Sequence, residues 1–200
     1  EGGDKINTPN KLTILRIMLV PLIIFLLSST WFGYKFLCSG IVFLIASYTD
    51  FLDGNLARKN NIITDFGQIM DPMADKILVS AILIFFVGLG FVPALAAAVI
   101  ILREFVITSV RFLVFQTSRR VVSANILGKL KTVSQMAAII TIFSVQSCLE
   151  IGKTSCNFIM QNLMFFEVLQ SALIWIAALL SLVSGLVYIY LNRKSIISSF

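Results

Sequence analysis

The chain has 200 residues, of which 58% are hydrophobic and 13% charged, and its mean hydropathy is +0.95. A soluble globular domain is nearer half apolar and a quarter charged, so this composition excludes an ordinary soluble protein and indicates an integral membrane protein. We expect one domain, over residues 6–200, because the chain is too short for two. Residues 1–5 (Glu-Gly-Gly-Asp-Lys) resemble in part the remainder of an expression tag and are left out of the fold prediction.

Two residue types limit the chemistry that the chain can perform. Histidine is absent, so acid–base catalysis falls to carboxylates rather than to an imidazole. Cys38, Cys148 and Cys156 are odd in number and form no CxxC pair, which indicates neither a disulfide framework nor a thiolate metal site.

In chain order, six apolar stretches predict six membrane-spanning helices, since a span needs about 20 largely apolar residues. Their expected ranges are 12–30, 36–59, 66–90, 92–116, 124–148 and 163–191. The polar segment 6–13, with its proline and capping residues, predicts a short interfacial helix before the first span. The expected fold is therefore an all-α, six-transmembrane-helix bundle with an N-terminal interfacial helix.

Basic residues flank these spans mainly on one side of the membrane, which predicts their orientation. That side carries Lys5, Lys11, Arg58, Lys59, Arg119, Arg120, Arg193 and Lys194, whereas the other carries Lys35 and Lys153. Both termini are then cytoplasmic. The net charge of +6 lies mostly on this face, where it would attract anionic headgroups or an anionic soluble substrate. We expect no nucleic-acid partner.

Four aspartates, Asp50, Asp53, Asp71 and Asp75, lie within the second and third predicted spans. Each charge at a helix centre in lipid costs about 2.5–3.5 kcal/mol on insertion scales, so four require a compensating cation. Spacings of three and four residues place each pair on one face of a helix. Two such pairs on neighbouring helices offer hard oxygen ligands, which favour Mg²⁺, Mn²⁺ or Ca²⁺ over zinc or copper.

The aspartates belong to the pattern D-x2-D-G-x2-A-R-x8-G-x3-D-x3-D, matched here at all its fixed positions. This pattern resembles the signature of the CDP-alcohol phosphotransferases, membrane enzymes of phospholipid synthesis that take a CDP-linked lipid and an alcohol and release CMP. The resemblance implies a six-helix bundle, a homodimer and a site for two Mg²⁺ or Mn²⁺ ions near the cytoplasmic surface.

The resemblance also implies roles for the residues of the pattern. Asp50, Asp53 and Asp71 would be metal ligands, and Asp75 would be a metal-adjacent carboxylate and the general base for the incoming hydroxyl. The remaining positions would bind the CDP group: the small residues would allow its close approach and the arginine would contact phosphate oxygens. These positions are Gly54, Ala57, Arg58 and Gly67.

A second resemblance, over residues 8 to about 135, is to the bacterial phosphatidylglycerophosphate synthases within that family. It is carried by three segments: Thr8-Pro9-Asn10 with Thr13 and Arg16, Arg103-Glu104-Phe105 with Arg111, and Gly128-Lys129 with Lys131, Thr132 and Gln135. It implies an enzyme of the bacterial inner membrane that transfers the phosphatidyl group of CDP-diacylglycerol to sn-glycerol 3-phosphate, giving phosphatidylglycerophosphate and CMP. Thr8, Pro9 and Asn10 would lie near the site.

An anionic acceptor requires fixed cations, and the fourth and fifth spans and the loop between them carry them. The expected acceptor-phosphate residues are Arg103, Arg111, Arg119, Lys129 and Lys131. Arg103 either binds the phosphate or is held by Glu104 or by a carbonyl group. Lys129 and Lys131 lie about 200° apart on a helix, so they cannot both face inward, and we expect Lys131 to face the substrate.

Two alternatives stay open at this point. The eight fixed positions are shared by enzymes with other acceptors, namely serine, inositol, inositol phosphate or phosphatidylglycerol, of which inositol phosphate also requires positive charge. Carboxylates inside a membrane also mark cation transporters. A transporter would distribute them over several spans, whereas here they cluster on two, which favours the enzyme.

Overall fold

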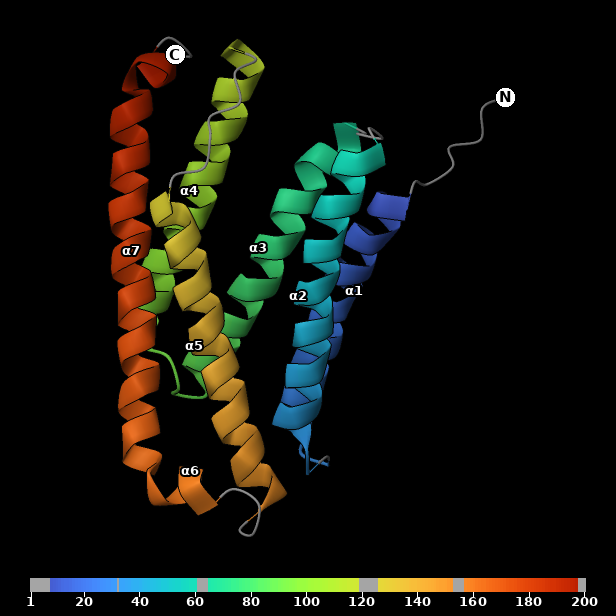
Figure 1. Cartoon of the computed structure of the whole chain (residues 1–200), viewed down its shortest axis with the longest axis vertical. Coiled ribbons are helices and arrows are strands. Elements are labelled where there is room, and N and C mark those ends of the chain that lie inside the picture. The colour runs from blue at the N-terminus through green and yellow to red at the C-terminus, as the bar shows by residue number, and fades with distance from the viewer. Residues whose placement is uncertain (1–7, 32, 61–64, 119–125, 153–156, 198–200) are drawn as a thin grey trace. The chain divides into compact units, whose positions relative to one another are not determined.

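The computed structural model describes residues 8–31, 33–60, 65–118, 126–152 and 157–197, and within these ranges the only regular elements are helices. The expectation of an all-α fold is therefore confirmed for these residues (Figure 1). The helices are α1 (Thr8–Ser28), α2 (Lys35–Asn60), α3 (Asp65–Gly88), α4 (Ala94–Ser118), α5 (Ile126–Ile151), α6 (Asn157–Gln161) and α7 (Leu163–Ile197).

The chain divides into two compact units. Unit 1 covers Glu1–Phe85 and Phe143–Asn157, and unit 2 covers Phe86–Ile142 and Phe158–Phe200. Unit 1 therefore contains α1, α2, most of α3 and the end of α5. Unit 2 contains α4, the start of α5 and α7.

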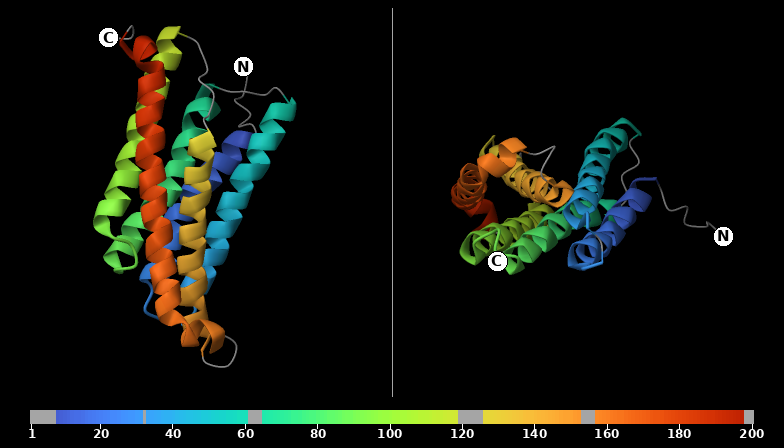
Figure 2. Two further views of the ribbon diagram at one scale, coloured as in Figure 1. Left: turned by 60° about the vertical axis from the view of Figure 1, so that its left-hand side comes forward. Right: turned by 90° about the horizontal axis from the view of Figure 1, so that it is seen from below.

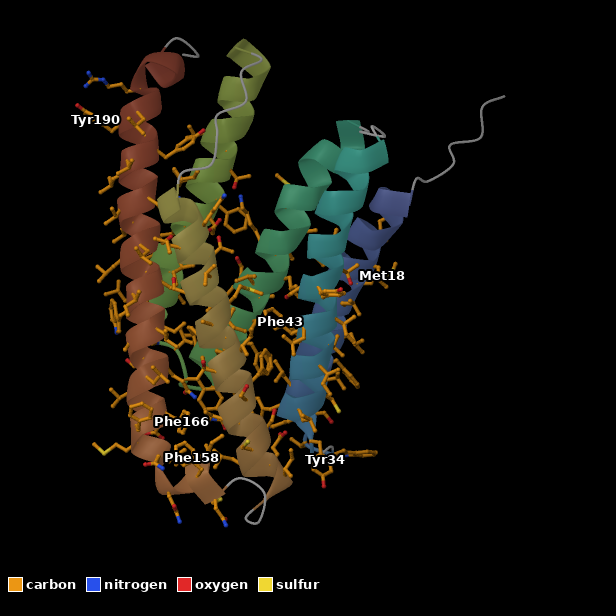
Figure 3. The ribbon with its side chains drawn as sticks, viewed as in Figure 1. Met18, Tyr34, Phe43, Phe158, Phe166 and Tyr190 are labelled. Atoms are coloured by element: carbon orange, nitrogen blue, oxygen red, sulfur yellow. The ribbon has the colours of Figure 1, made fainter. Side chains whose placement is uncertain are left out.

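Unit 1 is held together by apolar packing and by one close helix approach. α1 packs against α2. Gly40 on α2 permits the approach of α5, since a Cβ atom at that glycine would lie 3.3 Å from the Phe143 Cβ. One turn further along α2, the rings of Phe43 and Phe143 stack at a tilt, with centroids 5.7 Å apart (Figure 3). Both phenylalanines are buried, so this pair forms part of the unit's core.

Unit 2 is built on the contact between α4 and α7, which lie side by side and run in the same direction (Figures 1 and 2). The buried face of α7 consists largely of small residues, which let two helix backbones approach closely. These residues are Ala177, Ala178, Ser181, Ser184 and Gly185. Large apolar side chains cover the outward side of α7, among them Tyr190, which is 66% exposed (Figure 3).

The turn between α3 and α4 follows from its glycine and proline. Gly90 adopts a φ of 80°, the left-handed conformation that favours glycine. The N–H of Phe91 then donates to the carbonyl oxygen of Phe86 at 2.9 Å, which closes the end of α3. Pro93 precedes α4, and its carbonyl accepts the first helical bond, from Ala97, at 3.1 Å.

The predicted helices agree with the observed ones except at two places. The prediction of a separate interfacial helix before the first span is wrong, because residues 8–13 form the first turns of α1 itself. The helix continues through them since Pro9 lies in the first turn, where a missing N–H removes no intrahelical bond. The short helix α6 was not predicted, because its five residues are too few for a periodic pattern.

Two helical stretches of the described residues, Gly128–Ile151 and Leu163–Leu191, are long and apolar enough to cross a membrane. Three shorter apolar stretches are Ile14–Ser28, Lys35–Thr49 and Lys76–Gly88. These lengths and compositions agree with a membrane protein.

Candidate functional site

The aspartate pattern lies on two helices of unit 1. Asp50 and Asp53 are on the second half of α2, and Asp71 and Asp75 are on the first half of α3. α2 ends and α3 begins at the same end of this unit (Figure 1). The helical backbone thus agrees with the expectation that each pair occupies neighbouring turns of one helix.

The side chains of this pattern lie outside those that the structure describes. The same holds for the predicted CDP-binding residues Gly54, Ala57, Arg58 and Gly67. Among the described side chains, no group of three His, Cys, Asp or Glu residues could hold a metal ion. The metal and CDP sites therefore remain predictions from the sequence.

The described part of the candidate site is a cluster of three charged side chains and one hydroxyl group in unit 2, which we call the basic cluster: Arg103, Glu104, Lys131 and Ser184. The Lys131 ammonium on α5 forms an ion pair with the Glu104 carboxylate on α4. Nη1 of Arg103 lies 3.6 Å from the same carboxylate. Nη2 of Arg103 donates a hydrogen bond of 2.9 Å to the Ser184 hydroxyl on α7. Three helices thus contribute to one polar cluster.

The basic cluster is largely removed from solvent. The side chains of Arg103 and Glu104 are each 13% exposed and that of Lys131 is 6% exposed. Charged side chains at such burial are stable only when they are paired. The cluster's described members are two cations, one carboxylate and one hydroxyl group.

The charges of the sequence divide unequally between the two units. Unit 1 contains eight lysines and arginines and eight aspartates and glutamates. Unit 2 also contains eight lysines and arginines, but its only acidic side chains are Glu104 and Glu167. The whole net charge of +6 therefore belongs to unit 2, which makes this unit the favourable place for an anionic substrate.

The two lysines of α5 face different ways, as their spacing predicts. Lys131 is buried and Lys129 is exposed. The burial of Lys131 agrees with the expectation that only one of the two lysines points inward, whereas its facing the substrate stays a prediction. The remaining predicted acceptor residues, Arg111 and Arg119, lie outside the described side chains, as do Thr8, Pro9 and Asn10 in the first turn of α1.

The partners within the basic cluster were predicted only in part. Glu104 was one of the alternative partners predicted for Arg103, but its ion pair with Lys131 was not predicted. Ser184 was missed because α7 carries no motif. One signal was present: Ser181, Ser184 and Gly185 are small or polar residues within the apolar middle part of the helix. Such residues in a span often mark a contact between helices.

Comparison with known proteins agrees with the aspartate pattern. A family model described as CDP-alcohol phosphatidyltransferase matches residues 6–183. The CDP-diacylglycerol–glycerol-3-phosphate 3-phosphatidyltransferase of Bacillus subtilis is 38% identical over 208 residues, covering 96% of this chain and 98% of that protein. The protein of the same name from Rickettsia bellii is 34% identical over 191 residues, covering 94% and 96%. That from Escherichia coli is 35% identical over 138 residues, covering 66% and 74%.

The family model extends from the N-terminal segment through the aspartate pattern and the charged residues of the basic cluster into α7, where it ends at residue 183. Together with relatives that are more than 30% identical over nearly the whole chain, this match decides the family. The chain belongs to the CDP-alcohol phosphatidyltransferase family.

Proposed function

We propose that the protein transfers the phosphatidyl group of CDP-diacylglycerol to sn-glycerol 3-phosphate, giving phosphatidylglycerophosphate and CMP. The observation that carries the proposal is the likeness, over more than nine-tenths of both chains, to relatives named for this activity. The basic cluster supports the choice of acceptor, because two largely buried cations, Arg103 and Lys131, suit an alcohol that carries a phosphate. Serine and inositol carry no phosphate and would not require it.

The four aspartates of α2 and α3 are the proposed metal ligands. Asp50, Asp53, Asp71 and Asp75 supply hard carboxylate oxygens from two helices of one unit, a donor set that suits Mg²⁺ or Mn²⁺. Two such ions, when bound, would neutralise the diphosphate and stabilise the leaving CMP.

The CDP group is proposed to bind beside these aspartates. Gly54, Ala57 and Gly67 leave space for the nucleotide at the helix surfaces, and Arg58 offers a planar guanidinium to the phosphate oxygens. Asp75 is the proposed base. The acceptor hydroxyl attacks the phosphorus that carries diacylglycerol, its proton passes to the Asp75 carboxylate, and the bond from this phosphorus to the CMP oxygen breaks.

The acceptor phosphate is proposed to bind at Arg103, Arg111, Arg119, Lys129 and Lys131. The described members of this set belong to unit 2, which carries the chain's net positive charge. Thr8, Pro9 and Asn10 would lie near the site.

We further propose that the chain forms one membrane domain with six spans and that it acts as a homodimer. The unbroken family match over both units supports a single domain. Exposed apolar side chains on α1 and α7, such as Met18 and Tyr190 (Figure 3), suit contact with lipid. The basic residues at the helix ends support cytoplasmic termini, in the inner membrane of a bacterium.

CMP release tests the function. Purified protein in detergent is incubated with CDP-diacylglycerol, Mg²⁺ or Mn²⁺, and one of five acceptors: glycerol 3-phosphate, serine, inositol, inositol phosphate or phosphatidylglycerol. We expect release with glycerol 3-phosphate alone, and none in the presence of a chelator. Release with a different acceptor would overturn the proposed substrate, and no release from folded protein would overturn the proposed reaction.

A further inference from the structure

We propose that Glu104 is a positioning residue that holds Lys131 and Arg103 as a preformed cationic pair for the phosphate monoester of the acceptor. This inference rests on the proposed function and deepens it, since it assigns a role to a carboxylate in a site that must bind an anion. A carboxylate there would repel the substrate if it acted alone. Its effect must therefore pass through the two cations that it contacts.

The contacts link three helices through Glu104. Its carboxylate pairs with Lys131 on α5 and lies 3.6 Å from Nη1 of Arg103, its neighbour on α4. Arg103 in turn donates to the Ser184 hydroxyl at 2.9 Å, and that hydroxyl donates to the Ser181 carbonyl oxygen at 3.1 Å within α7. Each cation is therefore held in one place before a substrate arrives, which reduces the entropy lost on binding.

Burial gives the Glu104 carboxylate its role beside Lys131. The Lys131 side chain is 6% exposed, and an ammonium group at that burial is stable only beside an anion. Glu104 supplies such an anion from α4, whereas Glu167, the other acidic residue of unit 2, is exposed on α7. Removing the charge of Glu104 should therefore loosen the position of Lys131.

The side chain of Arg103 is also held in place by its contact with α7. A Cβ atom at Gly185 would lie 3.1 Å from Cγ and 3.3 Å from Nε of Arg103, so the side chain of Arg103 rests directly against this glycine. With Ser184 next to it, α7 sets both the course of the arginine side chain and the orientation of its guanidinium group. A planar guanidinium beside a lysine is an arrangement that suits phosphate oxygens.

The ligand chemistry is a phosphate group, which either substrate could supply. The lipid substrate carries a diphosphate, but the pattern proposed to bind it lies on α2 and α3. The basic cluster belongs to the unit with the excess positive charge and is assigned to the soluble acceptor. The experiments below distinguish the acceptor from the lipid substrate as the source of the bound phosphate group.

The first experiment compares Glu104→Gln with Glu167→Gln, which makes the same chemical change at an exposed position of the same unit. The KM for glycerol 3-phosphate and the KM for CDP-diacylglycerol are measured separately. We expect Glu104→Gln to raise the acceptor KM about tenfold or more and to leave the lipid KM within about twofold, while Glu167→Gln changes neither. A rise confined to the lipid KM would overturn the assignment to the acceptor.

The second experiment measures the affinity for inorganic phosphate by calorimetry, with no turnover. We expect Glu104→Gln to weaken phosphate binding about tenfold, because Lys131 and Arg103 would no longer be held in position by the carboxylate. Equal or tighter binding would overturn the inference, because it would show that the carboxylate only repels the anion. A third outcome is that Glu104→Gln weakens phosphate binding but the protein does not use glycerol 3-phosphate as its acceptor. This outcome would support the role of Glu104 and overturn the proposed acceptor.

Two further variants test whether Glu104 acts through its partners. If it acts partly through Lys131, then Glu104→Gln combined with Lys131→Gln should raise the acceptor KM by less than the product of the two single effects, and the remaining effect passes through Arg103. Additive effects would contradict this. Ser184→Ala keeps all the charges, so it applies even where Glu104→Gln does not fold. It should raise the acceptor KM about threefold through Arg103, and an unchanged KM would argue against a positioned arginine.

Discussion

The carboxylate of Glu150, near the end of α5, accepts hydrogen bonds from the backbone N–H of Phe36 in the first turn of α2. The distances are 2.9 Å to Oε2 and 3.1 Å to Oε1, and the N–H of Leu37 lies 3.3 Å from Oε2. The first N–H groups of a helix have no partner within the helix, and the start of a helix favours negative charge. Glu150 therefore caps α2 from another helix, 114 residues further along the chain.

Replacing this cap should destabilise the protein. We expect Glu150→Ala to lower the free energy of unfolding by about 1–3 kcal/mol, because hydrogen bonds to a charged group are lost at a half-buried helix end. Glu150→Gln should cost less, since its amide oxygen can still accept. Thermal unfolding in detergent measures both, with Glu167→Ala as the control at an exposed position. Equal melting temperatures for all three variants would contradict the capping role.

The close approach at Gly40 makes a second stability prediction. Gly40→Val would place methyl groups against Phe143, since even a Cβ atom there lies 3.3 Å from the Phe143 Cβ. We expect a loss of about 1–3 kcal/mol from overpacking. Gly33→Val is the control, because a Cβ atom at Gly33 meets nothing within 4 Å. Thermal unfolding distinguishes the two, and a variant at Gly40 as stable as the control would contradict this packing.

Gly185→Ala should impair acceptor binding more than stability. The added methyl group would displace the Arg103 side chain, which is anchored at its other end by Ser184. We expect the KM for glycerol 3-phosphate to rise about three- to tenfold, with the KM for CDP-diacylglycerol unchanged. Gly88→Ala, in the same unit and with nothing within 4 Å of the new Cβ, is the matched control. Equal acceptor KM values in the two variants would count against the arginine's role.

The aspartate pattern predicts loss of turnover without loss of fold. Asp71→Asn keeps the shape of the side chain but removes a proposed metal-ligand charge, so CMP release should fall by about a hundredfold or more. Asp65→Asn, the same change at the start of the same helix but at a variable position of the pattern, should keep most of the activity. Thermal unfolding of both variants verifies that they are folded. Normal CMP release by Asp71→Asn would refute the metal assignment.

The helices could be predicted from the sequence because long apolar runs and their breaks are local signals. Gly90 and Pro93 mark the turn between α3 and α4, and Gly152, with a φ of 91°, follows the end of α5. The start of α1 was placed wrongly, because a polar segment with Pro9 suits the first turn of a long helix as well as a short helix of its own. No local sequence signal distinguishes a separate short helix from the first turn of a long one.

Some features of the candidate site could also be predicted from the sequence, and others could not. The spacing of the aspartates and the excess of cations are properties of the sequence itself, and they were sufficient to indicate the family and an anionic acceptor. The opposite orientations of Lys129 and Lys131 also follow from helix periodicity alone. The contacts that fix the orientation of each cation could not be predicted from the sequence.

By itself, then, the sequence determined the helical membrane class, the aspartate pattern and the excess of positive charge. Only the tertiary structure decided that Lys131 pairs with Glu104, that Arg103 rests on Gly185 and bonds Ser184, and that Glu150 caps α2. The physical reason is that these helices are apolar on nearly every side. Their hydrophobic pattern does not say which face turns inward, so partners distant in sequence are chosen by packing.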